Sequence, residues 1–292
     1  MRARHVALAV LVTAAWGFSF VAIRVGLETF PPLFLVALRF AVAALPAVLL
    51  PRPPIPWARL AAIGATLFAG NFGFLFSGMA VGMPAGLASI VMQVQAFFTL
   101  AIVALVWRRA PARPQLAGMA LAFAGLAVIG TTVGGDVTGP GLGLTLLGAL
   151  SWAAGNVLLK EAGPADMLPL MAWVSLLPTA AMLGLSLGVE GPAAIGQALA
   201  AVPAGAVAAV LYLGIAATLV AFGLWGYLLR LYPATVVAPF SLLVPITGSL
   251  SAALVLGERF PPLRIAGMAL IVAGLAAVAF PTDRLRRWQG GD

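Results

Sequence analysis

The sequence predicts an all-α integral membrane protein whose ten transmembrane helices form two inverted five-helix repeats around a central cavity. Three observations support this fold class: the composition, a series of long apolar runs, and an internal repeat. Hydrophobic residues make up 63% of the 292 residues and charged residues only 8%, whereas a soluble domain carries about 25% charged residues. So few charges cannot cover a water-exposed surface, so we expect lipid to cover most of this chain.

Ten apolar runs are long enough to cross a bilayer, which takes about 20 residues each. Short connections rich in proline and glycine separate them, and none is long enough for a soluble domain. The first run is too long for the core of a signal peptide and lacks a clear cleavage site, so it counts as a span. The expected spans are Val6–Leu27, Leu33–Leu50, Ala58–Ala80, Gly86–Trp107, Gln115–Thr132, Gly141–Leu159, Leu168–Val189, Ala204–Leu229, Thr235–Gly257 and Leu263–Phe280.

The basic residues predict the orientation, because cytoplasmic loops carry an excess of Lys and Arg. If the N-terminus is cytoplasmic, the outer side keeps only Arg259 and Arg264, with Arg24 and Arg39 near or within helices. Both termini are therefore expected in the cytoplasm. The inner side would hold Arg2, Arg4, Arg52, Arg59, Arg108, Arg109, Arg113, Lys160, Arg230, Arg284, Arg286 and Arg287.

An internal repeat divides the chain into two expected units, residues 1–135 and 136–292. Residues 84–127 recur as residues 233–276, and both copies contain Ala-Gly-Met-Ala-Leu followed by Ala-Gly-Leu-Ala. Each unit holds five helices, and because five is odd the second unit enters the membrane with opposite polarity. Two such halves give two similar states, one open to each side, which is the architecture of alternating access. The repeat therefore predicts a transporter.

Two glycines in each copy are spaced to share one face of a helix. Small residues let helix backbones approach closely in a membrane, where packing lacks a hydrophobic driving force. We expect these four residues to serve helix packing: Gly118, Gly125, Gly267 and Gly274.

The end of the second repeat resembles a known family. Residues 256–259, Leu-Gly-Glu-Arg, followed by residues 265–274 look like the closing motif of an EamA repeat, after Pro239 and Pro245 in the preceding helix. The whole chain resembles the drug/metabolite transporter superfamily as two EamA units, and is most similar to the YddG-type amino-acid exporters. The resemblance implies ten helices, a central cavity and export of small metabolites from the bacterial cytoplasm. The first half departs from the pattern, with Ile90, Ala96 and Arg109 in place of Pro239, Pro245 and Glu258.

Polar and aromatic side chains inside the apolar runs are the candidates for a substrate site, because polar groups in a bilayer are costly and usually face a cavity or a partner. Tryptophans near mid-span lie away from the membrane interface and can stack on an amphipathic or aromatic solute. Each candidate can instead bond a neighbouring helix. Gln93 and Gln95 differ by about 200° around a helix, so only one should point squarely at the cavity. The candidate binding residues are Trp16, Asn71, Gln93, Trp152, Asn156, Tyr212 and Ser241.

Three prolines and one arginine also lie inside the runs. Pro178, Pro239 and Pro245 each remove a backbone hydrogen bond and permit a bend, either for gating or as a static kink. Arg39 is about two turns into its helix. It is expected to snorkel outward or to pair with Glu28, and the alternative is contact with a substrate carboxylate.

No catalytic centre, metal site or cofactor is expected. The chain has no Cys, which excludes a thiolate site, and its single His, His5, lies near the N-terminus, so a histidine-based centre is not expected. The net charge of +8 is attributed to membrane topology, and nucleic acid is not expected as a partner. No oligomer is required. No Asp or Glu lies at a helix centre, so we hypothesise facilitated transport driven by the substrate gradient.

The sequence thus indicates an exporter of amino acids, aromatic or neutral ones included, and of related small metabolites through the bacterial inner membrane. Three alternatives stay open. The first is export of cationic drugs or other metabolites within the same superfamily. The second is a lipid-linked flippase, which needs a lateral opening between helices. The third is an integral-membrane enzyme, which needs a cluster of buried titratable groups that the sequence lacks.

Overall fold

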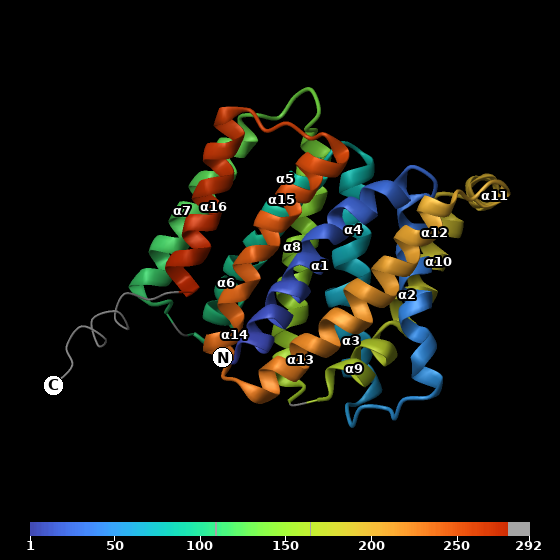
Figure 1. The fold of residues 1–292 in the computed structure, drawn as a ribbon, viewed down its shortest axis with the longest axis horizontal. Helices are drawn as coiled ribbons and strands as arrows, with labels where there is room; N and C mark the ends of the chain where they lie inside the picture. The colour runs from blue at the N-terminus through green and yellow to red at the C-terminus, as the bar shows by residue number, and fades with distance from the viewer. Residues whose placement is uncertain (109, 164, 280–292) are drawn as a thin grey trace.

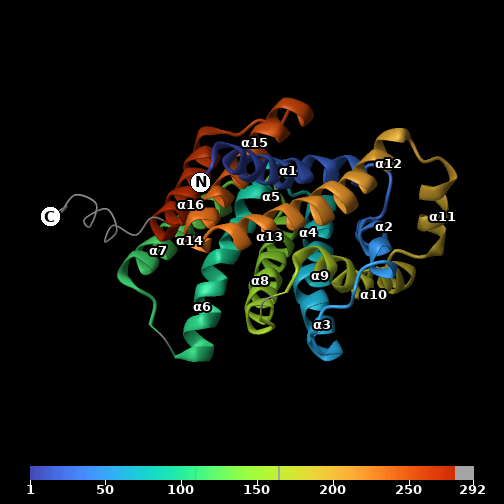
Figure 2. The same cartoon turned by 60° about the horizontal axis from the view of Figure 1, so that its bottom comes forward.

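A computed structural model of the chain describes residues 1–108, 110–163 and 165–279. These residues form a bundle of helices, and within them the only extended pairing is an isolated bridge between Gly134 and Val137 (Figures 1 and 2). The apolar runs fold as helices because in lipid every backbone N–H and C=O must find a partner within the chain. The predicted all-α class is confirmed.

The elements follow one another as helices with short 3₁₀ or π interruptions. The first half consists of α1 (Ala3–Leu27), α2 (Pro32–Ala44), η1 (Leu45–Val48), α3 (Trp57–Ile63), η2 (Gly64–Gly70), α4 (Asn71–Ala80), α5 (Ala85–Val91), η3 (Met92–Val94), α6 (Gln95–Trp107) and α7 (Arg113–Gly130). The second half consists of α8 (Gly139–Glu161), α9 (Met167–Val174), α10 (Leu176–Val189), α11 (Pro192–Ala200), α12 (Ala204–Leu211), η4 (Tyr212–Val220), α13 (Ala221–Leu231), α14 (Ala234–Val237), η5 (Ala238–Leu242), α15 (Leu243–Leu256) and α16 (Pro262–Ala279).

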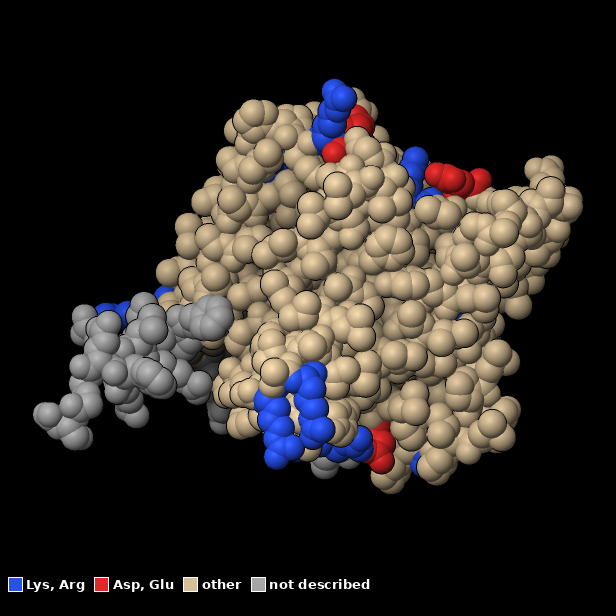
Figure 3. Space-filling model, viewed as in Figure 1, with Lys and Arg blue, Asp and Glu red and all other residues tan. Residues whose placement is uncertain are grey.

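Within the described residues, nine helical stretches are long and apolar enough to cross a membrane. The predicted second span differs, because its helix, Pro32–Val48, is shorter than the expected range Leu33–Leu50. Pro46 interrupts the α-helix near its end, and the last residues form the 3₁₀ turn η1. On the face shown in Figure 3, charged side chains gather mostly towards the two ends of the bundle, and few are visible between them, as expected for a membrane-spanning body.

Irregular turns interrupt several long helices near their middle. The segments η2 and η4 are π helices, and each follows the first α-helical part of the third span of its half. The segments η3 and η5 are 3₁₀ turns. Pro178 has no N–H to donate to the carbonyl of Val174, and the chain breaks between α9 and α10 at Ser175. Such breaks free backbone groups for contacts with other helices.

Helices α7 and α16 pack side by side along their glycines (Figure 1). A Cβ atom on Gly118 would lie 2.6 Å from the carbonyl oxygen of Gly274, and one on Gly125 would lie 2.5 Å from that of Gly267. The first glycine of one helix therefore meets the second of the other, so the two helices run antiparallel. The expectation that these four glycines serve close helix packing is confirmed.

Two carboxylates connect the halves of the chain at the end of the bundle opposite the N-terminus. Glu190, after α10, accepts hydrogen bonds at 2.8 and 3.2 Å from the first free N–H groups of α2. Glu258, after α15, accepts bonds at 2.6 and 2.9 Å from those of α5. The first N–H groups of a helix have no partner within it, and negative charge is favourable there. We call these two side chains the carboxylate clamps.

Burial and hydrogen bonding act in opposite directions on the second clamp. Burial raises the pKa of the Glu258 carboxyl, while the two backbone N–H donors of α5 lower it. At the same end, Arg264 donates two hydrogen bonds, at 2.8 and 2.9 Å, to the carboxylate of Asp136. The guanidinium holds the pKa of Asp136 below its usual range. This end of the bundle is therefore fastened by several charge-assisted contacts.

Candidate functional site

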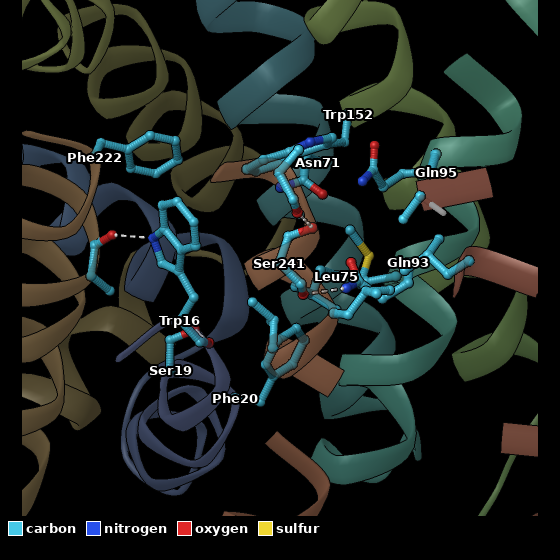
Figure 4. Close-up of a pocket in the computed structure, with 18 of the residues that line it drawn as sticks. Trp16, Ser19, Phe20, Asn71, Leu75, Gln93, Gln95, Trp152, Phe222 and Ser241 are labelled. Carbon is cyan, nitrogen blue, oxygen red and sulfur yellow. Dashed lines mark hydrogen bonds between the residues drawn. The ribbon is translucent and has the colours of Figure 1, made fainter. Parts of the chain in front are cut away.

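One cavity of about 590 Å³ lies within the bundle. Its wall comes from both halves of the chain: α1, α2, α4, η3, α6 and α8, and then η4, α13, the α14–α15 stretch and α16 (Figure 4). Most of the lining side chains are apolar, with a few amides and hydroxyls among them. A concave, largely apolar space of this size with a few polar groups is typical of a small-molecule site.

The wall of the cavity extends to the end of the bundle that carries the N-terminus. At that end its wall includes Thr235 and Pro239, near the start of the α14–α15 stretch, and Val278 near the end of α16. Its deep end includes Arg39 and Leu75, which lie nearer the carboxylate clamps. Helix α15 packs against α1 and α5.

The structure brings together most of the residues proposed from the sequence. Trp16, Asn71, Gln93, Trp152, Ser241 and Pro239 lie on the cavity wall. Asn156, Tyr212, Pro178 and Pro245 are not among its lining residues.

Gln93 and Gln95 both line the cavity, so the expectation that only one of them faces it is wrong. The 3₁₀ turn η3 covers Met92–Val94. In an α-helix the two side chains would lie about 200° apart, which is about 160° the shorter way round. A 3₁₀ turn rotates the chain by about 120° per residue, so here they lie about 120° apart.

Aromatic rings form one side of the cavity (Figure 4). The ring of Trp16 lies 5.0 Å from that of Phe222, and the ring of Trp152 lies 6.4 Å from Phe222 and 6.0 Å from Phe72. The indole Nε1 of Trp16 donates a hydrogen bond to the carbonyl of Ala217 at 3.0 Å. This bond orients the indole, so that the rings present flat apolar faces for stacking or cation–π contact.

Gln93 donates to a carbonyl that lacks its α-helical donor because of a proline. Pro245 has no N–H, so it cannot donate to the carbonyl of Ser241 four residues earlier. The Nε2 of Gln93 donates to that carbonyl at 3.3 Å, as the dashed line in Figure 4 shows. The hydroxyl of Ser241 donates to its own helix, at the carbonyl of Ala238. Pro245 therefore acts on the cavity wall indirectly, through the contact that it makes possible.

Asn156 supports the cavity from behind its wall. Its Nδ2 donates to the Oε1 of Gln95 at 3.0 Å. Since Gln95 lines the cavity and Asn156 does not, Asn156 orients the amide that a solute would meet.

Arg39 lies elsewhere than expected. Its side chain is buried, with an exposed fraction of 2%. The Nη2 atom donates to the Oγ1 of Thr218 at 2.8 Å. No ion pair with Glu28 occurs among the described residues, so the interpretations as a snorkelling or Glu28-paired side chain are wrong. The sequence did contain a signal of a functional role for Arg39, namely a charge two turns inside an apolar run, because such residues usually mark a functional site.

Tyr212 lies between helices, away from the cavity. Its hydroxyl donates to the carbonyl of Ala15 at 2.8 Å, and its ring contacts Phe18. Tyr212→Phe should therefore lower the free energy of unfolding by about 0.6 kcal/mol, the average for a hydrogen bond between membrane helices. Substrate affinity should stay within about twofold of the wild type, because the lost bond lies outside the cavity. Denaturation in detergent and a binding titration measure the two effects, and a large loss of affinity would return Tyr212 to the site.

The sequence profile of the EamA-like transporter family matches this chain twice, over residues 4–131 and over residues 139–280. The chain belongs to the EamA-like transporter family. The match spans most of both halves, so the resemblance inferred from residues 256–259 and 265–274 is confirmed. Membership also identifies the chain as a transporter and not an enzyme, as the sequence indicated.

This EamA-like transporter is similar to several named proteins. It is 42% identical over 275 residues, 92% of each chain, to a protein of Salmonella typhimurium named probable amino-acid metabolite efflux pump. A protein of Escherichia coli with the same name is 42% identical over 276 residues, again 92% of each chain. A probable terminal-alkyne amino-acid exporter of Streptantibioticus cattleyicolor is 30% identical over 294 residues, 95% of this chain and 94% of that one.

The fold also matches a crystal structure of another protein. The TM-score is 0.62 at 18% identity, and the match covers 98% of this chain and 99% of that one. This likeness shows that the EamA-like transporter shares its fold with an experimentally solved protein.

Proposed function

We propose that this EamA-like transporter exports amino acids, aromatic or neutral ones among them, and related small metabolites across the bacterial inner membrane. The observation that carries the proposal is the cavity, whose wall combines Trp16, Trp152 and Phe222 with the amides of Gln93 and Gln95. Such a wall offers both stacking and hydrogen bonds to a small zwitterion. The names of the relatives, probable amino-acid metabolite efflux pump, support the same substrate class.

Transport proceeds by alternating access between two inverted repeats, residues 1–135 and 136–292. The reciprocal glycine contacts of α7 and α16 support this arrangement, because residues related by a two-fold axis meet in such pairs. The π helices η2 and η4 at corresponding places in the two halves support it too. The short helix Pro32–Val48 then supplies the tenth crossing.

Both termini lie in the cytoplasm in this proposal. The support comes from the Lys and Arg residues. When the ten spans cross the membrane in alternating directions, most of these residues lie on the same side as the N-terminus. The cavity, whose wall extends to Thr235 and Val278 near that end, would then face the cytoplasm. That is the state in which an exporter loads its solute.

The substrate gradient drives transport. Among the described residues that line the cavity there is no Asp or Glu, so a carboxylate that could couple substrate and proton binding inside the cavity is missing there. The same observation favours zwitterions over cationic drugs, because Arg39 is the charged residue of this wall.

The test is transport by the purified protein in liposomes. An amino-acid panel in a counterflow assay should give protein-dependent exchange for at least one neutral or aromatic member. An imposed pH gradient without a substrate gradient should not drive accumulation. Exchange of cationic drugs alone, or of no panel member, would refute the proposed substrate class.

Trp152→Ala should weaken binding of the exported amino acid about tenfold, because it removes a stacking face worth about 1.5 kcal/mol. The exposed Trp57, which lies outside the cavity, provides the matched control. Trp57→Ala should leave the affinity unchanged. Isothermal titration of monodisperse protein gives the comparison, and equal affinities for the wild type and Trp152→Ala would remove this ring from the site.

A further inference from the structure

Arg39 is a buried cation with unused donors. Its Nη2 atom donates to Thr218 and, at 3.4 Å, to the carbonyl of Leu213. Its Nε and Nη1 atoms are buried and have no hydrogen-bond partner among the described residues. A guanidinium stays charged in proteins and has five N–H donors. Part of its hydrogen-bonding capacity is therefore unsatisfied in a place shielded from water.

The charge of Arg39 is compensated only in part. Its guanidinium carbon lies 4.1, 4.9 and 5.7 Å from the ring centres of Phe72, Phe40 and Phe76. Cation–π contacts of this kind are favourable when the cation is desolvated. No carboxylate forms an ion pair with Arg39 in residues 1–108, 110–163 and 165–279. A buried charge without a counter-charge is strongly unfavourable, so an anionic partner would be bound favourably here.

Asn71 supplies a second unused polar group in the same wall. Its exposed fraction is 1%, and neither Oδ1 nor Nδ2 has a partner. Asn71 precedes Phe72, whose ring lies against Arg39, and α2 packs on α4. Both Asn71 and Arg39 line the cavity. Buried polar side chains almost always have partners, so two orphans in one cavity wall point to a ligand.

We propose that Arg39 and Asn71 form the subsite that binds the carboxylate of the transported solute. The inference rests on the proposed export function and narrows it to solutes that carry a carboxylate. A carboxylate matches the forked donors of one guanidinium and neutralises a single positive charge. The remainder of the solute would then lie towards the aromatic side of the cavity, against Trp152 and Phe222.

A purely structural role for Arg39 makes a different prediction. Through Thr218 and Leu213, Arg39 also connects α2 to the π helix η4. If that were its only role, removing it would weaken the binding of every solute alike. A carboxylate subsite affects only solutes that carry the carboxylate, so the ratio of affinities for matched solutes separates the two roles.

The experiment compares an exported amino acid with its primary amide and its decarboxylated amine. For L-phenylalanine these are L-phenylalaninamide and phenethylamine. If another amino acid of the panel shows the highest exchange, that amino acid and its own amide and amine are used instead. The wild type should bind the amino acid at least about tenfold more tightly than either analogue, as expected for a charge-assisted hydrogen bond. Equal affinities of the wild type for all three would overturn the subsite.

Arg39→Gln should weaken binding of the amino acid at least about tenfold and change binding of the amine by less than about twofold. Arg39→Lys keeps the charge but lacks the forked pair of donors, so its affinity for the amino acid should lie between those of the wild type and Arg39→Gln. Arg52→Gln is the matched control, because Arg52 is exposed and outside the cavity. An equal loss of affinity for all three solutes would mean that Arg39 has only a structural role. Absence of amino-acid exchange by the wild type would instead refute the export function itself.

Asn71→Leu gives an independent measurement. Leucine is similar in size and has no polar atoms to satisfy, so the variant should unfold at the same temperature as the wild type or higher. Its affinity for the amino acid should fall several-fold, and more than its affinity for the amine. Unchanged affinity would remove Asn71 from the subsite.

Discussion

Gly155→Ala should destabilise the folded protein by about 1–3 kcal/mol, the usual range for overpacking a tight contact. Gly155 lies in α8 against the π helix η2, where an added Cβ would stand 2.7 Å from the Cα and Cβ of Leu67 and 2.8 Å from its backbone nitrogen. Backbone atoms cannot rotate away as the end of a flexible side chain can. The two helices would have to separate, and the methyl group would therefore cost packing along both.

The same helix offers the control. Gly143 also lies in α8, but a Cβ there would meet nothing within 4 Å, so Gly143→Ala should change stability little. Thermal unfolding in one detergent gives both values. Because Trp152 lies one turn before Gly155 and lines the cavity, Gly155→Ala should also weaken substrate binding. Equal stability of the two variants would mean that η2 and α8 are packed less closely than described.

Helix packing at the end of each repeat was predictable from the sequence. Gly118 and Gly125 recur as Gly267 and Gly274 in the same spacing, and the structure places each glycine against a partner from the other copy. Spacing reveals such a row because a helix repeats its face about every seven residues. The sequence alone did not reveal which glycine of one helix meets which glycine of the other.

The π helices η2 and η4 were not predicted. Their residues are ordinary apolar ones, and a π turn arises where packing between helices favours a wider turn, which leaves no clear mark in composition. One consequence is visible at Thr218, whose hydroxyl donates to the carbonyl of Leu213 five residues earlier and accepts from Arg39. Contacts of this kind depend on how helices pack in three dimensions, so the polar residues of each helix, taken separately, do not predict them.

The candidate site was predicted in outline. Residues with polar or aromatic side chains near mid-span did gather on the cavity wall, since those are the side chains that the bilayer excludes. The rotation of each helix about its axis was not predictable, and this explains Tyr212, which points at Ala15 and away from the cavity. The same uncertainty explains Arg39, whose depth in the bundle depends on how α2 packs on η4.

The two ends of the bundle differ in chemistry. Glu190 and Glu258, the carboxylate clamps, both come from the second half and hold the first turns of α2 and α5 from the first half. The residue that matches Glu258 in the first repeat is Arg109, which lies outside the described residues. A cation cannot accept hydrogen bonds from N–H groups, so the sequence provides no equal clamp at that position. We expect the clamps to favour the state in which the cavity opens towards the N-terminus.

Glu258→Ala should shift the protein towards the state that opens at the clamped end. The variant loses two charge-assisted hydrogen bonds, each worth about 1.5 kcal/mol or more, so the equilibrium should move on the order of a hundredfold. The chain has no cysteine, so Ser19→Cys, on the cavity wall, provides a single reporter in an otherwise unreactive background. A maleimide that cannot cross the membrane, added on the side opposite the N-terminus, should label this cysteine far faster in the Glu258→Ala protein.

Two further variants separate the clamp from a general effect of removing a carboxylate. Glu258→Gln keeps an oxygen acceptor but loses the charge, so its labelling rate should lie between those of the wild type and Glu258→Ala. Glu28 lies near the same end, and its side chain makes no hydrogen bond or ion pair among the described residues. Glu28→Ala should therefore label as slowly as the wild type. If Glu258→Ala labelled no faster than Glu28→Ala, the clamped end would be held shut by helix packing between α1, α5 and α15 and not by the carboxylate.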